Sequence, residues 1–294
     1  MRVLIVGCGY VGLPLGAELV RRGHTVFGMR RSAEGADELR AAGLTPLVAD
    51  VTRPETLRAL PGPFDWVVNT VSSSKGGADV YRAVYVDGTR HLIEWLASAP
   101  LRKYVYTSST SVYPQADGSE VNEESPAQPT TDTGRLLVET ENLLRTAAGE
   151  RHFPAVILRV AGIYGPERGF LFHQYLRGEA RLSGDGARLL NMVHREDVVG
   201  ASIAALERGH TGSTYNVADD EPVSQQAFFE WLSAKLGKPM PPPADESAVP
   251  ARKRGVTNKR VANRRLREEL RYALKFPTFR EGYTDEILRL GLAH

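Results

Sequence analysis

Three glycines near the start of the chain have the spacing of a phosphate-binding turn. Gly7, Gly9 and Gly12 fit the pattern G-x-G-x-x-G, with Tyr10 and Val11 between the last two. The apolar run RVLIV comes directly before the turn, and a helical pattern follows it. In that context small residues let the chain turn tightly, a pyrophosphate can approach the backbone, and the helix N-terminus stabilises its charge. The pattern therefore predicts a dinucleotide-binding turn rather than a plain glycine turn.

Two arginines follow the second apolar run, HTVFGMRRS, where the ribose of a bound dinucleotide is recognised. A protein selective for NAD has Asp or Glu at that position, whereas Arg30 and Arg31 can pair with a ribose 2′-phosphate. We therefore expect NADP as the cofactor, with NAD the weaker candidate. The alternative interpretation is a pair of solvated surface arginines. Asp50 and Val51, which end the third apolar run, are candidates to flank the adenine.

Short apolar runs alternate with helical segments through the first half of the chain, which predicts a parallel sheet covered on both faces. The helices are expected near residues 11–22, 33–42, 79–98 and 134–147. After Gly165 the pattern becomes irregular, and the tail after residue 219 is helical with a proline-rich break. The fold class is therefore α/β, a doubly wound Rossmann sheet with a second, smaller, mostly helical lobe.

The change in pattern also gives the domain boundaries. We assign residues 1–165 and 190–218 to an NADP-binding Rossmann domain, and residues 166–189 and 219–294 to a substrate lobe. The active cleft is expected between them, because ligands bind at the carboxyl ends of the strands in open sheets.

Composition excludes several other classes of protein. The 294 residues are 42% hydrophobic and 24% charged, with a formal net charge of +2. That charge argues against nucleic acid as the main partner, although the tail ARKRGVTNKRVANRRLREELRYALKF is locally basic. No segment is long enough to span a membrane. The one cysteine, Cys8, is expected to be packed, and it fits the reducing cytoplasm.

The glycine turn is followed along the chain by VYVDGTRHLIEWL, YTSSTSVY, LRVAGIYGP, NMVHREDVV and STYNVADDEPVS. Together these segments resemble the extended short-chain dehydrogenase/reductases, the NAD(P)-dependent epimerase/dehydratase family, over nearly the whole chain. The resemblance implies a small-molecule substrate, often a nucleotide sugar in that family, and a homodimer formed through the helices near 79–98 and 134–147. The residues expected to contact the cofactor are Gly7, Gly9, Tyr10, Val11, Gly12, Arg30, Arg31, Asp50, Val51, Thr70, Val71, Thr107 and Ile163, and no metal site is expected.

The family's catalytic set is a Ser or Thr together with the Tyr and Lys of Y-x-x-x-K. By its spacing from Tyr113, Ser109 matches the Ser position. Thr133 and Leu137 stand where the resemblance places the Tyr and the Lys, and Tyr85 replaces the family's Asn. A threonine hydroxyl titrates too high to act as a comparable acid, and leucine carries no charge. The resemblance is therefore to an atypical subgroup without the usual proton donor.

Four other residues are candidates for the replacement proton donor. Tyr113, Tyr164, Lys75 and His194 lie on segments expected near the carboxyl ends of the strands, although a structural role is the commoner one for each. Two functions remain open at this point. One is an NADP-dependent oxidoreductase or epimerase-like enzyme that uses Ser109, and the other is an NADP-binding sensor or partner-binding protein with little turnover.

Overall fold

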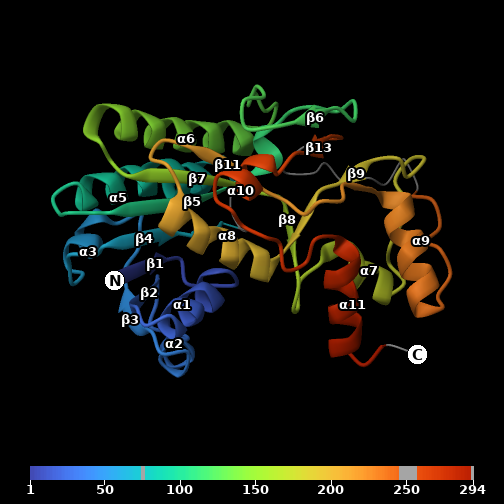
Figure 1. Ribbon diagram of the computed structural model, residues 1–294, viewed down its shortest axis with the longest axis horizontal. Helices are drawn as coiled ribbons and strands as arrows, with labels where there is room; N and C mark the ends of the chain where they lie inside the picture. The colour runs from blue at the N-terminus through green and yellow to red at the C-terminus, as the bar shows by residue number, and fades with distance from the viewer. Residues whose placement is uncertain (74–76, 245–256, 293–294) are drawn as a thin grey trace.

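The computed structural model describes residues 1–73, 77–244 and 257–292. In these residues a seven-stranded parallel sheet forms the centre of the molecule, with the strand order β11-β7-β5-β4-β1-β2-β3 (Figure 1). The strands are β1 (Arg2–Val6), β2 (Thr25–Arg30), β3 (Thr45–Val48), β4 (Trp66–Asn69), β5 (Lys103–Ser109), β7 (Ala155–Val160) and β11 (Thr214–Val217). The strand order runs from β1 to β3 on one side of β1 and continues with β4 on its other side. In open α/β sheets ligands bind where the strand order changes direction in this way, so the crevice is expected at the carboxyl ends of β1 and β4.

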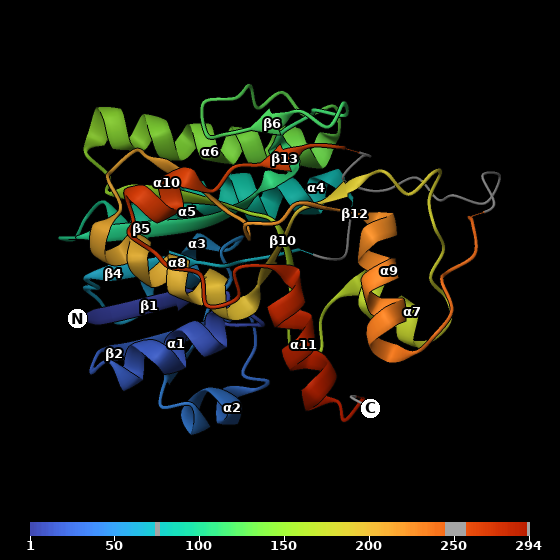
Figure 2. The same ribbon diagram turned by 45° about the vertical axis from the view of Figure 1, so that its right-hand side comes forward.

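Helices cover both faces of the sheet, as the alternating pattern predicted. Helices α1 and α8 pack together on one face, and α5 and α6 pack together on the other (Figures 1 and 2). The helices of this part of the chain are α1 (Gly12–Arg21), α2 (Ala36–Ala41), α3 (Pro54–Arg58), α4 (Ala78–Arg82), α5 (Gly88–Leu96), α6 (Asp132–Arg151) and α8 (Arg195–Arg208). The 3-10 turn η2 (Thr110–Val112) follows β5 directly.

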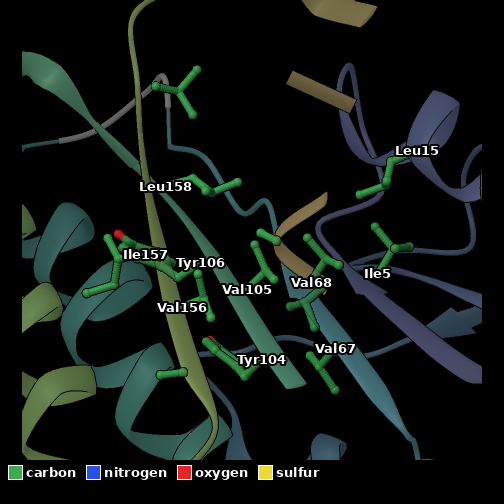
Figure 3. Packing of buried hydrophobic residues seen from close by; sticks show 14 of the residues in the cluster. Ile5, Leu15, Val67, Val68, Tyr104, Val105, Tyr106, Val156, Ile157 and Leu158 are labelled. Carbon is green, nitrogen blue, oxygen red and sulfur yellow. The ribbon is translucent and has the colours of Figure 1, made fainter. Parts of the chain in front are cut away.

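The central strands are buried on both faces, which explains why they appear in the sequence as continuous apolar runs. All six residues of β7 are buried, as are the last four residues of β1. Figure 3 shows the resulting contact between neighbouring strands, with Ile5, Val68 and Val105 side by side in successive strands. Packing in this core holds the carboxyl ends of the central strands at one edge of the sheet, and it therefore positions the loops that follow them.

The predicted helix near 79–98 is interrupted in the structure. Helix α4 ends at Arg82, a π-helical turn η1 (Ala83–Asp87) follows, and α5 begins at Gly88. A π-helical turn holds one more residue than an α-helical turn, and such turns often lie at functional sites. Here the turn carries Tyr85, the residue that replaces the family's asparagine.

A second, smaller apolar core lies beyond the carboxyl edge of the sheet. It is formed by α7 (Phe170–Leu176), α9 (Gln225–Leu236) and α11 (Phe279–Arg289), which lie together in both views (Figures 1 and 2). The short strands β8 (Gly162–Tyr164), β9 (Leu189–Leu190), β10 (Met192–His194) and β12 (Val223–Ser224) connect this lobe to the sheet.

The C-terminal boundary of this lobe differs from the sequence assignment of residues 219–294. Val261, Leu266 and Leu270 pack into the larger core instead. They belong to a segment with β13 (Arg260–Val261), which pairs with β6 (Glu120–Val121), and with α10 (Arg264–Glu268). An amphipathic pattern shows that a segment has an apolar face, but not which core that face contacts.

Candidate functional site

A cleft of about 1270 Å³ runs along the carboxyl ends of the central strands and reaches the second lobe. Its floor is formed where β1, β4, β5 and β7 end, and its far wall is the loop between β8 and α7. Of the residues expected to contact the cofactor, Gly12 is the exception that does not line it; those that do are Gly7, Gly9, Tyr10, Val11, Arg30, Arg31, Asp50, Val51, Thr70, Val71, Thr107 and Ile163.

The glycine turn has a geometry that suits a phosphate group. Gly7 has a φ of 82°, and a Cβ there would lie 2.8 Å from the backbone of Val71, so this position needs glycine. Gly9 is exposed, and a Cβ on it would have nothing nearer than the Gly7 carbonyl oxygen at 4.0 Å. A Cβ on Gly12 would lie 2.9 Å from that same oxygen, so Gly12 serves close packing.

The helix that follows the turn presents an uncapped N-terminus. Helix α1 has no side-chain cap and no acidic residue in its first turn. Its first N–H groups and dipole are therefore able to stabilise an anion at the turn. Cys8, inside the turn, is fully buried, and burial raises the pKa of its thiol to about 12, so it is a packed side chain rather than a reactive thiolate.

The two arginines after β2 have different environments. Arg30 donates from Nε to the Cys8 carbonyl at 2.7 Å and forms a 2.7 Å ion pair with Glu38. Arg31 is exposed and lines the cleft, and its side chain makes no ion pair with any residue the structure describes. Arg30 therefore braces the glycine turn, whereas the guanidinium of Arg31 is available to a ligand.

Three serines at the end of β5 and in the turn η2 face different surroundings. Ser108 is buried and donates its hydroxyl to Glu141 at 2.6 Å. Ser109 lines the cleft, and its Oγ accepts a hydrogen bond from the backbone N–H of Ser111 at 3.2 Å. The Oγ of Ser111 is buried and has no partner among the described residues. Although Ser108 also borders the cleft, Ser109 is the one whose hydroxyl is not committed to the protein interior.

Helix α6 presents an apolar side chain to the cleft. Leu137, at the position that resembles the family's Lys, lines the cleft and is 2% exposed. Thr133, at the position that resembles the Tyr, lies in the first turn of α6 and does not border the cleft. The helix is capped by Thr131, whose hydroxyl oxygen accepts from the Gly134 N–H at 3.2 Å.

A buried ion pair lies beneath this part of the cleft. Glu141 is fully buried and receives hydrogen bonds from Arg159 Nη2 at 2.7 Å and from Arg145 Nη2 at 2.8 Å. Burial by itself would raise the pKa of Glu141, but the hydrogen bonds and charge of Arg159 outweigh it and hold that pKa below its usual value. The pair connects α6 to β7 and, through Ser108, to the strand end that carries Ser109.

Tyr113 and Tyr164, two of the proposed alternatives for the proton donor, do not line the cleft. The hydroxyl of Tyr113 is buried, donating to Asn216 and accepting from Arg159, both at 2.8 Å. Tyr164 is stacked on Tyr283 with ring centroids 4.3 Å apart, inside the second core. The sequence placed both residues after strand ends, but it does not show toward which face a loop side chain turns.

His194 is also structural in its position. It caps α8, its Nδ1 accepting from the Glu196 N–H at 3.2 Å, and it is 1% exposed. Burial lowers its pKa to about 4, so the ring is neutral at physiological pH. Lys75, the remaining alternative, lies outside the described residues.

Several residues that line the cleft were not among the expected contacts, although Tyr85 was noted in the sequence as the replacement of the family's Asn. Tyr81 and Tyr85 line it with their ring centroids 4.3 Å apart, and Tyr85 accepts a hydrogen bond from the Ser73 N–H. Arg168, from the loop before α7, and Phe170, the first residue of α7, also line the cleft, and Phe170 is 73% exposed. The signal that marked them was the irregular stretch after Gly165, since such loops at strand ends often carry binding residues.

No group of three or more His, Cys, Asp or Glu side chains in the described residues could hold a metal ion. None of the helices in the described ranges is long and apolar enough to cross a membrane.

Comparison with known proteins identifies the family of this fold and cleft. Residues 3–218 match the model of the NAD dependent epimerase/dehydratase family. The chain belongs to that family. Its members bind a nicotinamide cofactor, which agrees with the glycine turn and the cleft described above.

Relatives and solved structures that this chain is similar to cover almost its whole length. Protein YeeZ of Escherichia coli is 28% identical over 281 residues, 94% of this chain and 96% of its own length. A 3-diazoavenalumate denitrifying reductase of Streptomyces sp. is 28% identical over 97% of this chain and 100% of its own.

Among solved structures, a conserved protein of unknown function from Silicibacter pomeroyi is 29% identical, covers 98% of this chain and 99% of its own, and has a TM-score of 0.79. The dTDP-glucose 4,6-dehydratase of Streptomyces venezuelae, solved with NAD, has a TM-score of 0.83 at 21% identity, and covers 98% of this chain and 96% of its own. That second likeness shows the shared fold.

Proposed function

We propose that this member of the epimerase/dehydratase family is an NADP-dependent oxidoreductase acting on a hydroxyl or carbonyl group of a small molecule. The observation that carries the proposal is the continuity of the cleft, which extends from Arg31 past the glycine turn to Ser109 and then to the second lobe. A dinucleotide lying along the first part of that path would place its nicotinamide near Ser109, with room for a substrate against the second lobe.

The residues present fit such a cofactor. Gly9 leaves open space above the turn, α1 has an uncapped N-terminus, and Arg31 has no ion-pair partner within the described residues. When bound, the cofactor supplies or accepts a hydride. The chain's own contribution is to orient the substrate oxygen through the Ser109 hydroxyl and to shield the ring with Leu137.

This cleft differs from the family's usual catalytic set in the residues that would transfer a proton. With Leu137 in place of Lys, no ammonium group at that position can lower a phenol pKa. A positioned general acid typically contributes about a hundredfold to ten-thousandfold in rate, so we expect turnover to be lower by a factor in that range. A substrate that needs little help from a protein acid would react fastest.

Cofactor selectivity is tested by isothermal titration calorimetry with NADP(H) and NAD(H). We expect NADP(H) to bind more tightly, and Arg31→Gln to weaken NADP(H) by about tenfold to a hundredfold while NAD(H) binding stays unchanged. Arg40→Gln on α2 is the matched control, since it removes one exposed charge that does not border the cleft. Equal affinities for the two cofactors in the unmodified chain would contradict NADP selectivity.

A cofactor-binding sensor or partner-binding protein with little turnover is the second candidate, favoured by the apolar Leu137 in the cleft. NADPH oxidation separates the two for substrates that are reduced, and chromatographic detection of the product separates them for substrates to which the hydride returns. The panel should contain nucleotide sugars, ketones and an aryl diazo compound, which are the chemistries named for the relatives. Turnover of none of them, with intact NADPH binding, would support the sensor.

We also propose a homodimer in the cytoplasm. The dimer would form through the exposed sides of α5 and α6, which pack together on one face of the sheet. The buried thiol of Cys8 suits a reducing compartment. Light scattering coupled to size exclusion checks the oligomeric state, and a mass of about one chain would contradict the dimer.

A further inference from the structure

Two arginines from different parts of the chain contact the same aromatic ring in the glycine turn. The guanidinium carbon of Arg168 lies 5.0 Å from the ring centroid of Tyr10, and that of Arg195 lies 4.9 Å from it. Arg168 comes from the loop between β8 and α7, and Arg195 is the first residue of α8. Cation–π contacts of this kind hold the second-lobe loop directly against the phosphate-binding turn.

The loop that carries Arg168 has a fixed conformation. The backbone of Arg168 forms two hydrogen bonds with Gly165, one in each direction, at 3.1 and 2.9 Å. Glu167 between them has a φ of 63° and Gly169 after them has a φ of 142°, values that L side chains rarely adopt. A non-glycine residue with a positive φ, such as Glu167, often lies at a ligand site, whereas glycine adopts such values without strain.

Both charges lack an anionic partner. Within the described residues neither Arg168 nor Arg195 is in a salt bridge, and the buried Nε of Arg195 has no hydrogen-bond acceptor. Most comparable arginines on this lobe are paired, as Arg177 is with Glu179 at 2.8 Å. Two carboxylates have an electrostatic influence on Tyr10: that of Glu167, which is exposed, and that of Glu286, which is buried and paired with Arg289 at 2.8 Å.

An unpaired guanidinium at the phosphate-binding turn indicates a phosphate ligand. Arg168 is exposed and lines the cleft, whereas Arg195 does not. The backbone of Tyr10 belongs to the turn on which the pyrophosphate of a dinucleotide rests. A guanidinium beside that ring can donate to two phosphate oxygens at once, which Lys cannot do with the same geometry.

We propose that Arg168 binds the pyrophosphate of the nicotinamide cofactor from the side of the second lobe, and that Arg195 is a positioning residue that holds Tyr10 in place for this contact. The cofactor would then lie between the glycine turn and the second lobe, so that binding it joins the two lobes. This inference rests on the cofactor binding of the proposed function, but not on the choice between NADP and NAD.

The test compares three ligands by calorimetry on the full chain. NADP⁺ and NAD⁺ contain the pyrophosphate, and adenosine 2′,5′-bisphosphate does not. Arg168→Gln is expected to weaken NADP⁺ and NAD⁺ alike, by about tenfold to a hundredfold, and to change the bisphosphate affinity by less than about threefold. Arg280→Gln on α11 removes one charge from the same lobe at a residue that does not line the cleft, and it is expected to leave all three affinities within about twofold.

Two variants of Tyr10 distinguish the contribution of its ring, which both arginines contact, from that of its hydroxyl group. Tyr10→Phe keeps the ring and is expected to bind both dinucleotides as the unmodified chain does, whereas Tyr10→Leu is expected to lose affinity as Arg168→Gln does. Thermal unfolding of each variant checks that the fold is kept.

The proposal is overturned if Arg168→Gln binds both dinucleotides normally, or if it weakens all three ligands equally. The first result would make Arg168 a structural residue, and the second would reduce its role to long-range charge. Absence of any dinucleotide binding by the unmodified chain would overturn the proposed function as well, and a preference for NAD⁺ would overturn only the NADP selectivity.

Discussion

Replacing Glu141 by Gln is expected to destabilise the fold far more than the same change at Glu139, two residues earlier on α6. Glu141 is fully buried and its partner Arg159 has a side chain 3% exposed, whereas Glu139 and its partner Arg82 are 40% and 48% exposed. The two carboxylates share one helix and one residue type. Their difference therefore isolates the effect of burial on an ion pair.

The magnitude follows from what each change leaves behind. Glu141→Gln leaves the guanidinium of Arg159 buried without a countercharge, which typically costs about 3 to 5 kcal/mol. That corresponds to a change of roughly a hundredfold to several thousandfold in the unfolding equilibrium constant. Glu139→Gln breaks a solvent-exposed pair worth about 0 to 1 kcal/mol, because water already screens both charges.

Urea unfolding followed by the fluorescence of the three tryptophans measures both variants at neutral pH. Because the pKa of Glu141 is held below its usual 4.5, its stabilising effect is present above pH 4.5 and is lost as the pH falls further. The gap between the two variants should therefore narrow in acid.

A double variant protects the test against simple failure to fold. Glu141→Leu with Arg159→Met removes both charges, and it is expected to be more stable than Glu141→Gln because no uncompensated charge remains. The reasoning is refuted if Glu141→Gln costs no more than Glu139→Gln, or if the double variant is the less stable of the two.

Four further expectations concern the cleft and its supports. Burial lowers the pKa of His194 from 6.5 to about 4. Between these pH values the unfolded chain therefore binds a proton at His194 that the folded chain does not. The free energy of unfolding should fall by up to about 3 kcal/mol as the pH drops from 6.5 to about 4. Urea midpoints at several pH values should show a smaller fall for His194→Asn, which keeps a helix cap but does not titrate. Gly7→Ala should lower the melting temperature, whereas Gly9→Ala should melt normally and bind cofactor more weakly, because its methyl group enters the space left for the pyrophosphate. Ser109→Ala should lower kcat/KM by about tenfold or more with cofactor affinity unchanged in calorimetry. Thr133→Ala should leave kcat/KM within about twofold of the unmodified chain, and loss of a robust turnover in this variant would show that α6 supplies a catalytic group after all.

The sequence predicted the α/β class and the position of the glycine turn correctly, because both depend on short-range patterns. The run RVLIV, the glycines after it and the helix that follows lie within about twenty residues, and their types are dictated by local backbone geometry and by burial on both faces of the sheet. The family followed from motifs of the same local kind.

The assignment of individual side chains within the site needed the structure. Arg30 and Arg31 are equivalent in the sequence, yet one is held by Cys8 and Glu38 and the other is exposed to the cleft. Likewise Tyr113 follows η2 and Tyr164 ends the short strand β8, and both rings turn into the interior. The direction of a side chain at the end of a strand depends on what packs above it, and the sequence pattern holds no information about that neighbour.

The sequence by itself determined which segments end at the carboxyl edge of the sheet, since alternation of strands and helices leaves few topologies open. Only the tertiary structure decided which distant residues meet there. Arg168 and Arg195 are 158 and 185 residues from Tyr10 along the chain, and they share its ring because the loop before α7 and the start of α8 both pack against the glycine turn. Contacts between such distant segments arise from the packing of whole elements, which no local pattern encodes.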